Sequence, residues 1–173
     1  MKDKQTLTQQ ILQILQKQIG FHRQLLETIR MEKEALVNAD LSGIQEATYA
    51  KEALVEGIKQ QEAERIKTST ELALVFKKPL RELTLTGIIL EVQGWDLKMA
   101  DTLRSAQNTL ALLAQRISDQ NKYNKDLVEK SLGHVQEMKK NVLGESTPRS
   151  DTYSQSGQKV NATPSSRLIS KEA

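Results

Sequence analysis

The feature that most constrains this 173-residue chain is an apolar stripe that recurs every three or four residues over long stretches without proline. The first stretch covers residues 6–67, and another covers residues 95–143. Steps of three and four place apolar side chains on one face of an α-helix. The pattern therefore predicts two long amphipathic helices, neither of which can bury its stripe alone.

The region between these stretches is typical of a bend. Thr68 and Glu71 fit a capping box that would start a short helix, and Pro79 would end that helix near Lys78. Residues 83–92 have strand-like, β-branched character, but no second strand candidate lies nearby, so we interpret them as helix. We expect an all-α fold: a long antiparallel, coiled-coil-like helical hairpin with a short helix in the turn region. Trp95, at the start of the last helix, is interpreted as a packing anchor against the turn.

Asp40 is the one candidate break within the first long stretch. An aspartate in this place could cap a new helix. However, the apolar stripe keeps its phase across Asp40. We therefore expect a single continuous or mildly kinked helix through this position.

The composition changes abruptly after residue 143. Serine, threonine, asparagine, glutamine, glycine and proline dominate residues 144–173. Such a segment cannot bury enough apolar surface to offset the entropy lost on ordering. The sequence thus predicts a helical domain, residues 1–143, and a disordered C-terminal tail, residues 144–173. Tyr153 and the pair Leu168-Ile169 are either docking points in this tail or incidental residues.

Residues that carry catalytic or metal chemistry are isolated. The chain has no cysteine, and His22 and His134 each stand alone on a long helix without metal-ligand spacing. Carboxylates are plentiful, but a two-helix rod has no deep pocket in which to perturb their pKa values. No phosphate-binding glycine loop is present. We therefore expect no enzymatic activity, no metal and no cofactor.

Charge and hydropathy restrict the partners and the location. The net charge of +3 is spread along the chain without a strongly basic block, so we expect no nucleic-acid binding. No apolar run approaches the ~20 residues needed to cross a bilayer, so we expect no direct membrane insertion. The absence of cysteine and of a signal peptide favours a cytoplasmic location.

The apolar stripe is wider than a two-stranded seam requires. Adjacent apolar pairs widen it in the first stretch, at positions 11/12, 14/15, 25/26, 36/37 and 54/55. In the last stretch a heptad seam runs from Leu103 to Ile117, then Gln120 and Asn124 occupy seam positions, and the apolar residues shift. Surplus apolar surface indicates self-association or a helical ligand.

Three motifs follow one another in a recognisable order. The first stretch contains EKEALVNADL at residues 32–41 and then KEAL at 51–54; the last contains NKDLVEKSL at 124–132; and the tail contains YSQSGQ at 153–158. In these motifs and their order, over most of the chain, the sequence resembles the FlgN family of flagellar type III export chaperones. The resemblance implies a helical antiparallel coiled coil, in agreement with the periodicity.

The resemblance also implies a function and partners. Family members bind hook–filament junction proteins before export, shield their helical termini and hand them to the export gate. The residues that would form the cargo-binding groove share one region of the last helix: Asn124, Leu127, Val128, Leu132 and Val135. The tail residues Tyr153, Gly157 and Gln158 would dock to the cytoplasmic domain of the export-gate membrane protein.

The sequence leaves two questions open. The alternative function is a structural coiled-coil scaffold or self-associating spacer without secreted cargo, and a homodimer is compatible with either function. The extension after Gln158, which includes Arg167-Leu168-Ile169, departs from shorter family members, and the resemblance assigns it no role.

Overall fold

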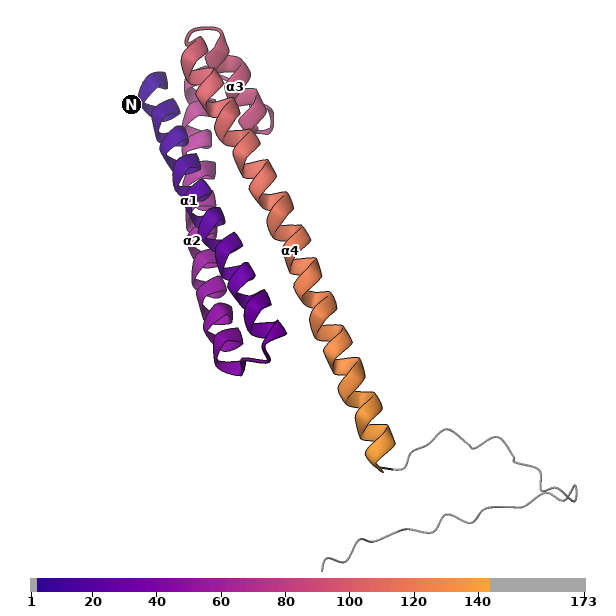
Figure 1. The fold of residues 1–173 in the computed structure, drawn as a ribbon. Coiled ribbons are helices and arrows are strands. Elements are labelled where there is room, and N and C mark those ends of the chain that lie inside the picture. The colour runs from indigo at the N-terminus through magenta and orange to yellow at the C-terminus, as the bar shows by residue number, and fades with distance from the viewer. Residues whose placement is uncertain (1–2, 144–173) are drawn as a thin grey trace, which may run out of the picture. The chain divides into compact units, whose positions relative to one another are not determined.

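Two helices of nearly equal length pack side by side in opposite directions at the start of the chain (Figure 1). The computed structural model describes residues 3–143. In it, α1 comprises Lys4–Val37 and α2 comprises Leu41–Phe76. Pairs that join the two helices, such as Gln18 with Glu62 and Lys51 with Glu32, establish the antiparallel arrangement. The helices thus form a hairpin within the first half of the chain.

The prediction of one continuous helix through Asp40 is wrong. The chain reverses at residues 38–40, where Ala39 has a left-handed φ of 52° and the Asp40 N–H donates to the Ala35 carbonyl at 2.9 Å. Asp40 then caps α2, because its carboxylate accepts a hydrogen bond from the Gly43 N–H at 3.1 Å. The periodicity of the apolar stripe is compatible with a straight helix and with two helices joined by a turn, so it did not distinguish between them.

The far end of α2 agrees only in part with expectation. Thr68 does not start a new helix: it lies inside α2, and its hydroxyl donates to the Glu64 carbonyl. The helix ends at Phe76, with Lys77 in the left-handed region at φ 53°, so the predicted stop before Pro79 is confirmed.

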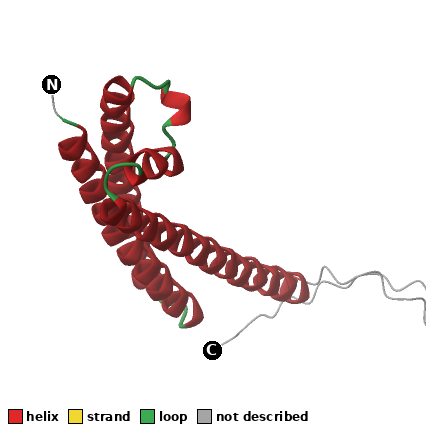
Figure 2. Ribbon diagram, turned by 90° about the horizontal axis from the view of Figure 1, so that it is seen from above, coloured by secondary structure: helices red, strands yellow, loops and turns green. Residues whose placement is uncertain are grey.

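Two short helical segments connect α2 to the last helix. A 3-10 turn, η1, comprises Leu80–Glu82, and α3 comprises Leu85–Gln93, capped by the Thr84 hydroxyl. The helical interpretation of the β-branched stretch is therefore confirmed. In the view from above, α3 lies beside the ends of the longer helices (Figure 2).

The hydrophobic core lies where α3 meets the first half of α1, the end of α2 and the beginning of α4. Its fully buried members have aliphatic side chains with at most 1% exposure: Leu7, Ile11, Leu15, Leu72, Ile88, Val92, Ala100 and Leu103. Trp95 packs against this cluster and lies beneath the Lys4 ammonium, 4.5 Å from the ring centroid. Its interpretation as a packing anchor is confirmed.

The last helix, α4, comprises Leu97–Leu143. It begins at Asp96, whose carboxylate accepts a hydrogen bond from the Met99 N–H at 2.9 Å. Because Trp95 lies near Lys4 and Asn124 contacts Ile29, α4 runs in the same direction as α1. The antiparallel partner of α1 is therefore α2, and not the last helix as the sequence had suggested.

By their internal contacts, the residues divide into two units, 1–130 and 131–173. The second unit is described only from 131 to 143, where it is helical, and the predicted tail lies outside the described residues. Every regular element among residues 3–143 is a helix, which confirms the all-α class. None of these helices is both long and apolar enough to cross a membrane.

Candidate functional site

The first part of α4 uses its apolar face for packing. Leu103, Ala106 and Leu113 are buried, and Leu110 and Ile117 are half-buried. These are the residues of the predicted heptad seam. This part of the helix therefore has little apolar surface left for a ligand on that face.

Asn124 marks the last fully buried position along α4. It is 4% exposed, and its amide nitrogen donates to the Ile29 carbonyl at 2.9 Å and to a Glu32 carboxylate oxygen at 3.0 Å. Gln120 donates to the Asn124 amide oxygen at 3.1 Å, and Lys51 pairs with the other oxygen of Glu32. The amide of Asn124 is thus engaged by α1 and by its own helix.

The remaining predicted cargo residues have increasingly exposed side chains. Leu127 is half-buried, and the exposed fractions of Val128, Leu132 and Val135 are 47%, 56% and 61%. At about 100° per residue, these three exposed positions fall on the same face of α4 as Asn124, within an arc of about 80°. The packed face of α4 therefore continues as an uncovered apolar stripe toward the end of the helix.

Two more apolar residues extend this stripe and were not included among the predicted site residues. Met138 is 66% exposed, and Val142 is 84% exposed. Val142 follows Val135 by seven residues, so the heptad spacing that placed Val135 in the site could also have placed Val142 there. Hereafter the uncovered stripe denotes Val128, Leu132, Val135, Met138 and Val142.

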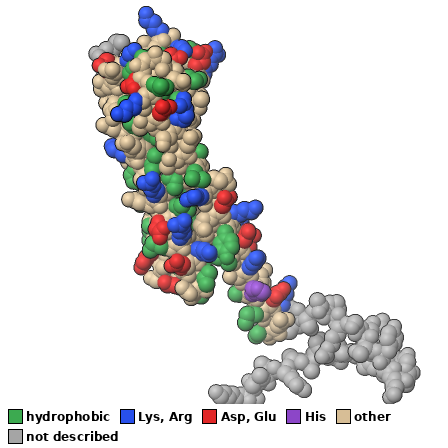
Figure 3. Space-filling model, turned by 45° about the horizontal axis from the view of Figure 1, so that its top comes forward, with side chains coloured by type: hydrophobic (Ala, Val, Ile, Leu, Met, Phe, Trp, Pro, Cys, Tyr) green, Lys and Arg blue, Asp and Glu red, His purple; other side chains and the backbone are tan. Residues whose placement is uncertain are grey.

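Charged side chains border the uncovered stripe. Lys125 and Glu129 form an exposed ion pair at 3.7 Å, and His134 lies 4.0 Å from Glu137. Figure 3 shows hydrophobic and charged side chains alternating on the surface of the last described part of α4. An apolar strip between charged margins is the form of surface that binds the apolar face of another helix.

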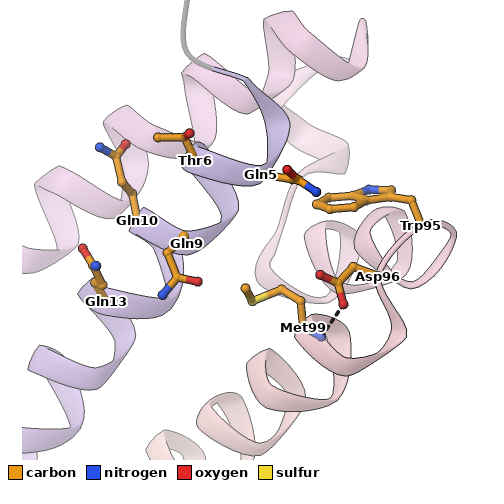
Figure 4. A pocket seen from close by; sticks show the side chains of 8 residues that line it. All are labelled: Gln5, Thr6, Gln9, Gln10, Gln13, Trp95, Asp96 and Met99. Carbon is orange, nitrogen blue, oxygen red and sulfur yellow. Dashed lines mark hydrogen bonds between the residues drawn. The ribbon is translucent and has the colours of Figure 1, made fainter.

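A different kind of surface lies between the start of α1 and the start of α4, where a hollow of about 560 Å³ opens (Figure 4). Half of its lining residues are glutamines; the full set is Gln5, Thr6, Gln9, Gln10, Gln13, Trp95, Asp96 and Met99. The Asp96 carboxylate is used to cap α4. The eight lining residues include no nucleophile paired with a base, as covalent catalysis would require.

Within residues 3–143, no three His, Asp or Glu side chains come close enough together to hold a metal ion. His22 bonds to the Gln18 carbonyl of its own helix instead.

Comparison with known protein families places the chain in one of them. Residues 1–161 match the family described as FlgN protein. The chain belongs to the FlgN family. No individual curated protein and no solved structure matches it significantly. Membership gives the chain the general role of a flagellar export chaperone, which is a binding role and not an enzymatic one.

The family match covers the predicted gate-docking residues but not the whole tail. Tyr153, Gly157 and Gln158 fall within the matched range. They lie outside the residues that the structure describes. The match ends at Asn161, so Arg167-Leu168-Ile169 follows the part of the chain that the family accounts for.

Proposed function

We propose that this FlgN-family protein binds the helical termini of hook–filament junction proteins through the uncovered stripe of α4 and delivers them to the type III export gate. The supporting observation is the exposure of Leu132 and Val135 on a helix face that is packed further upstream. Water contact with such side chains is unfavourable, and covering each one fully is worth about 1.5–3 kcal/mol. A ligand that covers several of them gains affinity from apolar burial.

The form of the stripe favours a helical ligand. Val128, Leu132, Val135 and Val142 recur at steps of three, four and seven, which is the spacing that an amphipathic partner helix can match residue by residue. Isolated helical termini of a secreted protein expose a similar stripe and associate readily. Binding to α4 would cover both surfaces at once until export begins.

Asn124 has a different role in this proposal from that of the exposed residues. Its buried amide is already bonded to Ile29 and Glu32, so it positions α4 against α1. Direct contact with cargo would come from the exposed residues beyond it. Leu127, which is half-buried, lies at the transition between the packed and uncovered parts of the helix.

The proposal is tested with the double variant Leu132→Asp/Val135→Asp. Because both side chains are exposed, we expect helix content to stay the same while affinity for a purified hook–filament junction protein falls by about 100-fold. Isothermal titration calorimetry measures the affinity, and circular dichroism measures the helix content.

A matched control exists on the same helix. Leu112 is 53% exposed, close to the 56% of Leu132, but helical spacing puts it on the opposite face of α4. Leu112→Asp should leave cargo affinity unchanged. Equal affinity of the double variant and the wild-type protein would refute the proposed surface. Loss of a stable dimer in sedimentation, without any effect on cargo, would support the self-associating spacer instead.

Delivery is assigned to the tail. We attribute docking on the cytoplasmic domain of the export-gate membrane protein to Tyr153, Gly157 and Gln158, on the basis of the family motif in which they lie. A tyrosine has a rigid apolar ring and a polar tip, which suits a shallow pocket from which the chaperone must be released.

A further inference from the structure

A second hollow of about 510 Å³ lies beside the turn between α1 and α2. Small residues create it: Ala35 and Ala47 form part of its lining at 8% and 6% exposure, together with Gly43 and Ala50. A Cβ atom at Gly43 would lie only 3.1 Å from the Ala35 Cβ, so the two helices approach closely here. Hereafter the tip groove denotes this hollow.

The rim of the tip groove is acidic. Glu34, Asp40 and Glu46 line it, whereas no lysine or arginine does. Neither Glu34 nor Glu46 forms an ion pair with any residue in the range 3–143. Met31, which is 60% exposed, adds an apolar edge. Figure 3 shows acidic and basic side chains interspersed toward this end of the hairpin, and the charged ones that line the groove are acidic. A ligand for this groove should therefore combine aliphatic side chains with positive charge.

The chain contains a segment of that kind with no assigned role. Residues 167–171 read Arg-Leu-Ile-Ser-Lys, with two adjacent aliphatic residues between two cations. The segment lies beyond the family match, which ends at residue 161. Its aliphatic side chains match the small residues of the groove, and its cations match the carboxylates of Glu34 and Glu46 on the rim.

Chain length permits the segment to reach the groove. Residues 131–143 form about 20 Å of helix, and residues 144–167 can extend over about 80 Å. The whole of α1, with 34 residues, is about 50 Å long. A tether of this kind gives an effective concentration in the millimolar range. Even with a millimolar intrinsic dissociation constant, the segment would therefore occupy the groove about half of the time.

We propose that the C-terminal segment Arg167–Lys171 docks in the tip groove of its own chain. Leu168 and Ile169 cover the alanine floor, and Arg167 and Lys171 face Glu34 and Glu46. The groove lies on the α1–α2 hairpin and not on the uncovered stripe of α4. Docking in the tip groove is therefore independent of the cargo-binding surface.

The test places a nitroxide spin label at Ser170→Cys in the full chain, which has no other cysteine. Paramagnetic broadening of backbone amide signals then reports which residues the segment approaches. We expect about a twofold loss of intensity at Ala35, Gly43 and Ala47 and none at Ile88 in α3. Raising the salt concentration should weaken the broadening, because the rim charges are screened.

Two matched variants of the labelled chain identify which contacts cause the broadening. Leu168→Ser/Ile169→Ser keeps the cations and should restore the groove signals, and so should Glu34→Gln/Glu46→Gln, which leaves the segment intact. Broadening that is unchanged in both variants, or that is no stronger at the groove than at α3, would overturn the proposal. A mixture of labelled, isotope-free chains with unlabelled ¹⁵N chains should show no broadening; broadening of the groove signals in this mixture would overturn docking within one chain.

Discussion

Asn124 interrupts the apolar face of α4, and its polarity has a structural cause. The amide satisfies two acceptors on α1 and accepts a hydrogen bond from Gln120. A buried polar group of this kind is costly when its partners are misaligned, so it favours one register of two helices over others. In this protein it specifies where α4 lies along α1, just before the helix face becomes uncovered.

Removing this amide should destabilise the protein. We expect Asn124→Ala to lower the free energy of unfolding by about 1–3 kcal/mol, because a buried hydrogen-bonded group is lost and a cavity remains. Urea denaturation followed by circular dichroism measures this change. Asn121→Ala on the exposed side of α4 is the control and should change stability little. Equal stability of the two variants would show that the buried amide has no such role.

Glu62 contributes a pH-dependent link between α1 and α2. Hydrogen bonds from Arg65 lower the pKa of the Glu62 carboxyl from its ordinary value of 4.5; partial burial opposes this effect, and the hydrogen bond from Gln18 adds to it. A carboxyl with a depressed pKa in the folded state stabilises the fold above its unfolded pKa. That stabilisation is lost as pH falls through the folded value.

We therefore expect the free energy of unfolding to decrease from pH 6 to pH 3, in part because Glu62 becomes protonated. Glu62→Gln should be less stable than the wild-type protein at pH 6 and should converge with it at low pH. Urea denaturation at a series of pH values provides the comparison. Glu52→Gln, at an exposed position of α2, is the control, and an identical pH profile for all three proteins would contradict the expectation.

Among the elements, the α1–α2 turn is the one that sequence periodicity misjudged. Ala39 adopts a left-handed conformation, which costs an alanine about 1–2 kcal/mol relative to ordinary helix geometry. The close approach of Gly43 to Ala35 and the cap at Asp40 hold the turn in place despite that cost. Of these features, the close approach of Gly43 to Ala35 exists because α2 lies against α1.

Because of the left-handed conformation at Ala39, we expect a glycine at this position to stabilise the protein. Ala39→Gly should raise the free energy of unfolding by about 0.5–1 kcal/mol, because glycine adopts positive φ without steric penalty. A continuous helix through this position would lose about 1 kcal/mol from the same change. Thermal and urea unfolding distinguish the two signs.

Ala53→Gly supplies the reference for that experiment. Ala53 is an exposed position in the interior of α2, so this change should lower stability by about 1 kcal/mol. If both glycine variants lose stability equally, the reversal at residues 38–40 is refuted.

At the level of the whole molecule, the proposed binding and delivery functions reside in different parts of the chain. Cargo is assigned to the uncovered stripe of α4, and gate docking to the motif at residues 153–158. Under this proposal, the chaperone would hold cargo and contact the export gate at the same time through separate surfaces. They also allow each function to be removed without the other.

Tyr153→Ala tests this separation. We expect unchanged affinity for a hook–filament junction protein and at least about tenfold weaker binding to the purified cytoplasmic domain of the gate protein, since a tyrosine anchor commonly contributes more than 1 kcal/mol. Tyr153→Phe, which keeps the ring, should retain most of the affinity. Loss of cargo binding in Tyr153→Ala would place the tail in the cargo site instead.

Local sequence determined the helical class, the apolar faces and the stop before Pro79. Both the spacing of side chains along a helix and the steric effect of proline act over only a few neighbouring residues. It also indicated the stripe around Leu132 and Val135, since that stripe repeats along one helix. The order of three weak motifs was sufficient to indicate the family, which residues 1–161 then matched.

Tertiary structure alone decided where the chain reverses, which helix pairs with α1, and which apolar side chains stay uncovered. The three-and-four repeat is the same whether a helix continues through Asp40 or folds back on itself, so it contains no information about direction. Likewise, Asn124 falls on the apolar face of its helix, and contact with α1 is what makes this polar residue buried and hydrogen-bonded. Burial depends on partners distant in sequence, and helical periodicity does not encode those partners.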